Sequence, residues 1–134
     1  MIVVDTNILA HFWFPSDSTE LCDELYQKDP EWVAPILWRS EFRSVVTLYL
    51  RKELIDFAEA LLIMEKAELQ MKDYQFQVNS VRVLHHASRS TCSSYDCEFV
   101  SLAKDLDLDL VTMDKKLLRV FPELAKHPEK VMES

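Results

Sequence analysis

Four acidic side chains stand where carboxylates could do chemistry. Asp5 directly follows the apolar run at residues 2–4, and Asp114 comes just after the run at residues 110–112. Both runs are typical of strands buried on both faces, and these two aspartates are therefore predicted to lie at the carboxyl ends of parallel strands. A turn or helix-cap role for either one is the simpler alternative, because aspartate is common after strands.

The other two acids fall on apolar faces of predicted helices. Glu41 lies four residues after Leu37 and four before Val45. Asp96 lies three residues before Phe99. Side chains three or four residues apart share one helix face, so both carboxylates are expected to point toward the core. A buried carboxylate must find a partner or take up a proton.

Together these acids indicate a divalent-cation site, since four neighbouring carboxylates would otherwise repel one another. Mg²⁺ and Mn²⁺ prefer carboxylate and water oxygens, and one or two ions would fit such a set. Asn7 and Thr112 add neutral oxygens beside it. The alternative is that each acid pairs with a nearby arginine, such as Arg39 or Arg43.

Strands alternate with helices along the chain, a pattern that predicts parallel pairing through right-handed crossovers. The fold class expected is α/β, a three-layer α/β/α sandwich with a short, mainly parallel central sheet. In such sheets the site lies beyond the carboxyl ends of the strands. Strands are predicted at residues 2–4, 32–34, 75–78 and 108–112, with a last edge strand at 131–132. Helices are predicted at about residues 7–13, 16–29, 36–52, 53–72, 95–106 and 115–121, with Asn7 capping the first. A further helix is expected through residues 81–85, capped by Asn79 or Ser80.

Composition narrows the functional classes. The chain has 134 residues, the length of one typical domain, and residues 1–134 are expected to form a single domain. Its glycine count is 0, which excludes the glycine-rich phosphate loops, the dinucleotide turn and the glycine elbow of hydrolases. The net charge of −8 argues against gripping nucleic acid by bulk charge, although not through metal ions. The 3 cysteines form no CxxC pair, and no apolar run is long enough to span a membrane, which favours a cytoplasmic location.

The ordered acidic motifs carry a family resemblance over essentially the whole chain. They are IVVDTNIL at residues 2–9, Ser40-Glu41, SYDCEFVSLA at residues 94–103 and LVTMDKKL at residues 110–117. This set resembles the PIN-domain family, and most closely its VapC-type ribonuclease toxins of bacterial and archaeal type II toxin–antitoxin pairs. Cys97 departs from the small residue that the family commonly has there.

The resemblance implies a PIN-like nuclease domain that hydrolyses RNA phosphodiesters with metal-activated water and leaves a 5′-phosphate and a 3′-hydroxyl. Asp5, Glu41 and Asp96 would be the catalytic and metal-binding core, and Asp114 a more variable fourth member. Asn7 and Thr112 would be supporting polar residues. The implied partners are an RNA substrate, a cognate antitoxin whose basic segment reaches into the acidic pocket, and a second copy in a homodimer. Exposed apolar residues in helices 16–29 and 36–72 could seat either protein partner.

Several cations are candidates for contact with RNA phosphates. Those favoured are Arg39, Arg43, Arg89 and Lys115, with Arg82 and Lys116 as further candidates. The aromatic run at residues 12–14 could stack on bases, although at least two of its rings are expected in the core or at a partner.

Two other functions compete with the nuclease. One is a phosphatase or phosphoacceptor that uses Asp5 as its nucleophile, which would leave Glu41 and Asp96 unexplained. The other is a PIN-like binding module without catalysis, which the presence of all four acids disfavours.

Overall fold

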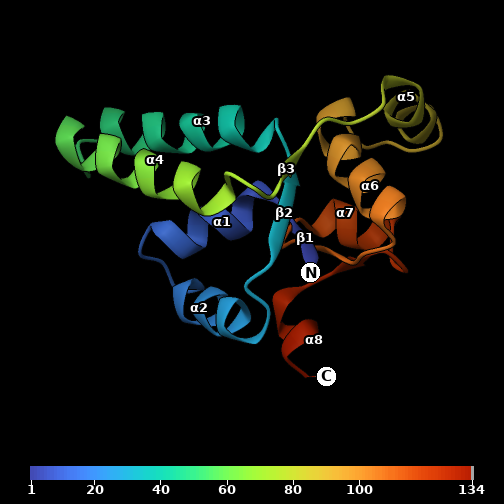
Figure 1. Ribbon diagram of the computed structural model, residues 1–134, viewed down its shortest axis with the longest axis horizontal. Coiled ribbons are helices and arrows are strands. Elements are labelled where there is room, and N and C mark those ends of the chain that lie inside the picture. The colour runs from blue at the N-terminus through green and yellow to red at the C-terminus, as the bar shows by residue number, and fades with distance from the viewer. Residues whose placement is uncertain (134) are drawn as a thin grey trace.

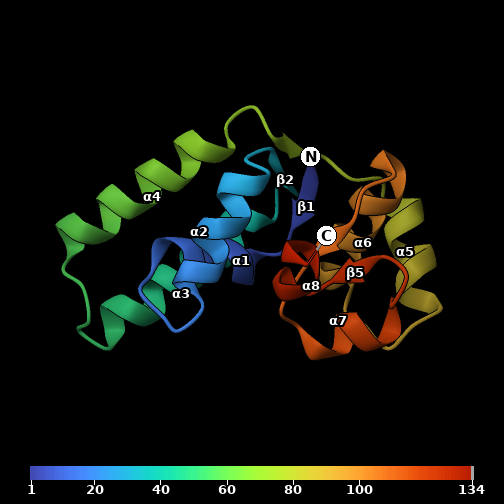
Figure 2. The ribbon, with the colours of Figure 1, turned by 90° about the horizontal axis from the view of Figure 1, so that it is seen from below.

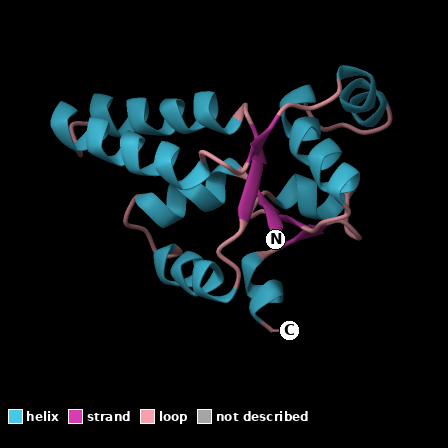
Figure 3. Cartoon of the chain, in the orientation of Figure 1, coloured by secondary structure: helices cyan, strands magenta, loops and turns pink. Residues whose placement is uncertain are grey.

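Five short parallel strands form the centre of the molecule, as the computed structural model shows for residues 1–133. The strand order is β3-β2-β1-β4-β5, and every neighbouring pair is parallel. The strands are β1 (Ile2–Val4), β2 (Trp32–Pro35), β3 (Gln75–Phe76), β4 (Leu110–Val111) and β5 (Ala125–Lys126). Figure 3 shows them between two groups of helices. The predicted α/β fold with flanking helical layers is therefore confirmed.

Eight helices flank this sheet within residues 1–133. Helices α1 to α4 gather on one side and α5 to α7 on the other, in both views of the ribbon (Figure 1, Figure 2). The helices are α1 (Thr6–Trp13), α2 (Thr19–Lys28), α3 (Trp38–Arg51), α4 (Phe57–Met71), α5 (Ser80–Ser88), α6 (Ser94–Leu106), α7 (Lys115–Val120) and α8 (Pro128–Met132). None of them is both long and apolar enough to cross a membrane.

The sheet order sets where a site can form. From the central strand β1 the chain passes to β2 on one side, and β4 lies on the other. Ligands of such sheets bind where the order reverses, outside the carboxyl ends of the strands. That point lies between the ends of β1 and β4, which pair Val4 with Val111. Both residues are fully buried, as expected of strands covered on both faces.

Two predicted features of the fold are wrong. Val131 and Met132 belong to α8, because His127 caps that helix and Pro128 occupies its first turn. The edge strand is instead Ala125–Lys126, which pairs with β4. The cap of α1 is Asp5, not Asn7, since the Asp5 carboxylate accepts the Thr6 N–H at 2.8 Å.

The aromatic run at residues 12–14 packs in the helical layer rather than at the sheet edge. Phe14 is buried and stacks on Tyr49 with ring centroids 4.1 Å apart. The Phe12 ring packs against Trp32 at 5.1 Å, and Trp13 donates to Gln70 at 2.8 Å. These rings therefore stabilise the contacts of α1 with its neighbours, and their predicted role in stacking on RNA bases is not supported.

Two helices of this glycine-free chain end at residues whose backbone is in the left-handed conformation. Glu53 after α3 and Asp107 after α6 have φ of 58° and 55°. In each case the next residue closes a six-residue turn: the Leu54 N–H donates to the Tyr49 carbonyl at 3.0 Å, and the Leu108 N–H to Ala103 at 2.9 Å. A side chain in this conformation costs about 1 kcal/mol or more, which glycine avoids.

We therefore expect Glu53→Gly to raise the free energy of unfolding by about 1 kcal/mol, because it removes the left-handed penalty at an exposed position far from the sheet edge. Glu65→Gly, in the middle of α4, is the control and should lower the free energy of unfolding by about 1 kcal/mol. Denaturant unfolding of both variants measures the difference. A loss of stability in Glu53→Gly would contradict this account of the α3 terminus.

Candidate metal centre

The Asp5 carboxylate is fixed at the end of the central strand. Its backbone N–H donates to the Val111 carbonyl at 2.9 Å, which ties the ends of β1 and β4 together. Its Oδ1 accepts the Thr6 N–H at 2.8 Å, and its Oδ2 accepts the Thr112 hydroxyl at 2.8 Å. The residue is only 8% exposed, so the orientation of its carboxylate is set by these partners rather than by water.

Asn7 and Thr112 form a polar bridge beside Asp5. The Asn7 Nδ2 donates to both Asp5 Oδ2 and Thr112 Oγ1 at 3.3 Å, while its Oδ1 accepts the Met113 N–H at 3.2 Å. The Thr112 hydroxyl also accepts the Asp114 N–H at 3.0 Å. This network connects the first turn of α1 with the segment after β4, and it holds Asp5 and the start of the Asp114 loop in a fixed relation.

Glu41 reaches the same edge from α3. Its Oε1 accepts the hydroxyl of Thr6 at 2.7 Å, and Thr6 is the residue that follows Asp5. The carboxylate is half-buried, in keeping with its predicted place on an inward face. Thr6 was not among the predicted site residues. Its hydroxyl beside Asp5 was the signal available in the sequence, but its partner on α3 emerges only from the fold.

Asp96 and Asp114 each lie at the start of a helix. Asp96 is in the first turn of α6, where its N–H donates to the Ser93 hydroxyl at 3.0 Å. Asp114 caps α7 through its Oδ1, which accepts the Leu117 N–H at 2.9 Å. Negative charge is favourable at these helix ends. Asp5 and Asp114 are thus cap residues, as the simpler interpretation held, and a cap role still leaves their carboxylates at the sheet edge.

Neighbouring charges and burial act together on these carboxylates. Burial raises the pKa of Asp5 to about 6, and the charges of Glu41 and Asp96 add to the rise, against the lowering effect of the hydrogen bonds from Thr112 and Thr6. Burial and the Asp96 charge raise the pKa of Glu41. Burial and the Asp114 charge raise the pKa of Asp96. The four acids therefore form one electrostatically linked group.

The predicted arginine partners do not neutralise this group. Arg39 approaches Glu68 of α4 at 3.9 Å, and Arg82 pairs with Asp105 at 2.7 Å. No ion pair among residues 1–133 includes any of the four acids. The alternative in which Arg39 or Arg43 balances Glu41 is therefore wrong for the described chain.

The other predicted RNA contacts are spread unevenly around the site. Arg43 and Lys115 are exposed, and Arg89 is exposed at the end of α5. The cation closest in effect to the acids is the half-buried Lys116, whose charge lowers the pKa of Asp96. Lys116 is among the further candidates predicted from the sequence, and its effect on Asp96 emerges only from the fold.

The oxygen donors at this site are the type that a hard divalent cation prefers, although the side chains as placed do not form a complete coordination shell. Within residues 1–133, no three or more histidine, cysteine or acidic side chains stand close enough to hold a metal ion as they are placed. The carboxylates nevertheless raise one another's pKa and lack a balancing ion pair. A divalent cation would supply that missing charge, and carboxylate oxygens are the ligands that Mg²⁺ prefers, so the residues present fit such an ion by their chemistry.

A fifth acid joins the group from α6. Glu98 is half-buried, and burial together with the Glu41 charge raises its pKa. It was not among the predicted site residues, because it follows Asp96 by two positions and so falls on another face of the helix. Its nearness to Glu41 follows from the packing of α6 against the loop after β2.

The raised pKa of Asp5 makes the stability of the metal-free protein depend on pH. The folded state holds this proton more tightly than the unfolded state, so the free energy of unfolding should fall by about 3 kcal/mol as pH rises from about 3 to about 7. Asp5→Asn should abolish this fall in the free energy of unfolding. Asp73→Asn, a substitution at an exposed position, should leave the fall unchanged. Denaturant unfolding with a chelator at several pH values measures it. An identical pH dependence in Asp5→Asn and in the unsubstituted chain would contradict the raised pKa.

Several solved structures have the same fold, and the similarity extends over nearly the whole chain. The PAE2754 protein of Pyrobaculum aerophilum superposes with a TM-score of 0.77 at 20% identity, over 98% of this chain and 93% of that one. FitAcB of Neisseria gonorrhoeae gives 0.72 at 14% identity, over 96% and 99%. A toxin–antitoxin complex of Klebsiella pneumoniae contains a chain that gives 0.71 at 13% identity, over 96% and 98%. At these identities the likeness shows the fold.

The family is shown by the sequence itself. Comparison with the curated proteins finds no match. The family model of the PIN domain, in contrast, matches residues 2–121, a span that includes the four acids and the sheet edge at which they meet. The chain belongs to the PIN domain family.

Proposed function

We propose that this protein is a metal-dependent endoribonuclease that acts as the toxin of a toxin–antitoxin pair. The observation that carries the proposal is the linked group of Asp5, Glu41, Asp96 and Asp114 at one sheet edge, none of which forms an ion pair within residues 1–133. PIN domains are generally nucleases and typically use divalent metals. The four acids would hold one or two Mg²⁺ or Mn²⁺ ions.

Each polar residue at the edge has a task in this proposal. When bound, a divalent ion would lower the pKa of water and offset the charge that builds on the phosphate. Thr112 and Asn7 hold the Asp5 carboxylate in one orientation, and Thr6 does the same for Glu41. Burial of Asp5 keeps bulk water from competing for its oxygens. Lys116 would meet the phosphate from the Asp96 side.

RNA is the proposed substrate rather than an established one. Its phosphates would contact Lys116 first, with Arg43, Arg89 and Lys115 around the site. The chain's charge of −8 makes a broad electrostatic grip unfavourable, so recognition would depend on the shape and bases of the RNA.

A phosphoacceptor role for Asp5 fits the geometry poorly. Both oxygens of this carboxylate already accept hydrogen bonds, Oδ1 from Thr6 and Oδ2 from Thr112 and Asn7. A nucleophilic oxygen needs a free approach to phosphorus, which the 8% exposure of the residue does not offer. A binding module without catalysis would keep four mutually repelling carboxylates at a cost in stability and with no purpose.

An antitoxin is the proposed protein partner. Two of the structurally similar proteins are described as FitAB bound to DNA and as a toxin–antitoxin complex. A basic antitoxin segment would offset the charge of the acids in place of a metal ion. A homodimer in the cytoplasm of a bacterium or archaeon completes the proposal, and exposed Phe57, Leu61 and Leu69 of α4 offer apolar surface for a partner.

The activity test uses two matched aspartates on one helix. Asp96→Asn should lower Mg²⁺- or Mn²⁺-dependent RNA cleavage at least 100-fold, because it removes a carboxylate from the proposed metal site. Asp105→Asn, two to three turns along α6 and paired with Arg82, should leave the rate within about twofold. Gel analysis of a structured RNA measures both rates, and end-group analysis should find a 5′-phosphate. Equal cleavage by Asp96→Asn and the unsubstituted protein would contradict the proposal.

The role of Lys116 gives a second test. Lys116→Gln should lower kcat/KM for RNA about tenfold, the equivalent of one charge-assisted hydrogen bond of about 1.5 kcal/mol. Arg82→Gln is the control and should change kcat/KM little, because Arg82 is committed to Asp105. Initial rates of RNA cleavage, measured at one ionic strength, distinguish the Lys116→Gln variant from the Arg82→Gln control. A larger loss in Arg82→Gln than in Lys116→Gln would place the RNA on the opposite face of α6.

A further inference from the structure

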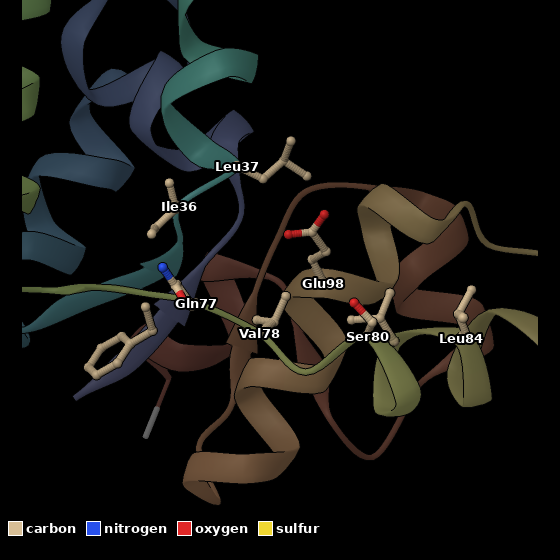
Figure 4. Close-up of a pocket in the computed structure, with 9 residues that line it drawn as sticks. Ile36, Leu37, Gln77, Val78, Ser80, Leu84 and Glu98 are labelled. Atoms are coloured by element: carbon tan, nitrogen blue, oxygen red, sulfur yellow. The ribbon is translucent and has the colours of Figure 1, made fainter.

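A groove of about 560 Å³ opens beside the acidic group. It lies between the loop after β2, the segment after β3, and helices α5 and α6, as Figure 4 shows. Leu37 forms one wall, Val78 and Leu84 form the other, and Phe76, Gln77 and Glu98 also line it. A volume of this size is in the range of small-ligand sites, roughly 300–1,000 Å³.

The groove adjoins the acids through Glu41. The Glu41 N–H donates to the Leu37 carbonyl at 3.1 Å, so the groove wall and this acid are one helical turn apart on α3. The Glu41 charge also acts directly on Glu98. A polymer that places a phosphate at Asp5 and Asp96 would therefore bring an adjoining residue of its chain over Glu41 and into the groove.

Glu98 is the polar group that the rest of the fold does not use. Its side chain points into the groove in Figure 4. Among residues 1–133 it makes no hydrogen bond or ion pair that would satisfy its oxygens. A half-buried carboxylate of this kind gains most from a ligand that offers N–H donors, since it accepts hydrogen bonds and repels phosphate.

We propose that this groove binds a guanine base of the RNA next to the cleaved phosphate, with Glu98 as the residue that selects it. The proposal rests on the nuclease function. Guanine is the base that offers two adjacent donors on different nitrogens, N1–H and N2–H₂, and a carboxylate can accept both at once. Adenine and cytosine offer only an amino group on that edge, and uracil only one N–H.

The rest of the groove suits a flat aromatic ring. Phe76 is 36% exposed and offers a ring face on which a base can stack. Such stacking strengthens the binding of every base without distinguishing among them. Leu37, Val78 and Leu84 give the groove apolar walls. Among residues 1–133, Glu98 is the one acidic or basic side chain that lines the groove, beside the polar Gln77 and Ser80, and the proposal assigns the choice among bases to it.

A binding test that does not depend on cleavage uses nucleotides. Chemical-shift titrations of the metal-free protein should place 5′-GMP at the backbone amides of Gln77, Val78 and Leu84. We expect 5′-GMP to bind at least fivefold more tightly than 5′-IMP, which lacks only the 2-amino group, and more tightly than 5′-CMP or 5′-UMP. Glu98→Gln should abolish this preference, Phe76→Ala should weaken all nucleotides alike, and Glu65→Gln on α4 should change nothing.

Three results would overturn the proposal: equal affinity for 5′-GMP and 5′-IMP, an unchanged preference in Glu98→Gln, or groove signals that respond to protein concentration instead of nucleotide. The last would mean that a second copy covers the groove.

Sequencing of cleavage products from a randomised RNA then separates this inference from the nuclease function. Glu98→Gln should lose the guanine preference beside the cut, so that guanine-flanked sites and other sites are cut at equal rates relative to one another, whatever the overall rate of the variant. Cleavage with no base preference in the unsubstituted protein would overturn the guanine site alone. Absence of cleavage together with selective 5′-GMP binding would overturn the nuclease function alone.

Discussion

The mutual repulsion of partly buried carboxylates is the constraint on which this structure depends. The fold brings Asp5, Glu41, Asp96 and Asp114 to one sheet edge, where burial and neighbouring charges raise the pKa of the first three. No arginine or lysine forms an ion pair with them within residues 1–133. Such an arrangement lowers stability unless something positive arrives. A divalent cation is the ligand proposed to neutralise this charge.

The surrounding framework is arranged to withstand that repulsion. β1 and β4 are hydrogen-bonded up to the point where their acids begin, and Asn7 and Thr112 continue the connection beyond the strands. Two of the acids also cap helices, so the N-terminal ends of α1 and α7 offset part of their charge. Asp5 and Asp114 thus serve the fold as helix caps, which confirms the simpler interpretation, and their role in the proposed chemistry stays a prediction.

Local sequence signals predicted the parts of the fold that depend on local chemistry. The apolar runs before Asp5 and Asp114 lie in buried strands, and α5 is capped by Asn79, one of its two candidate caps. The last edge strand was placed wrongly, because a two-residue run such as Val131-Met132 carries no periodicity. The hydrogen bond of Thr6 to Glu41 and the electrostatic effects of Lys116 on Asp96 and of Glu41 on Glu98 join elements distant in sequence. They required the fold itself.

The most direct test of the central claim is a calorimetric titration of the metal-free protein with Mn²⁺ at pH 6 and pH 8, in buffers of different ionisation enthalpy. With the pKa of Asp5 at about 6, binding at pH 6 should release about half a proton from this residue, and at pH 8 almost none. Glu41→Gln should weaken binding strongly. Absence of Mn²⁺ binding, or binding that neither releases protons at pH 6 nor depends on Glu41, would contradict the account.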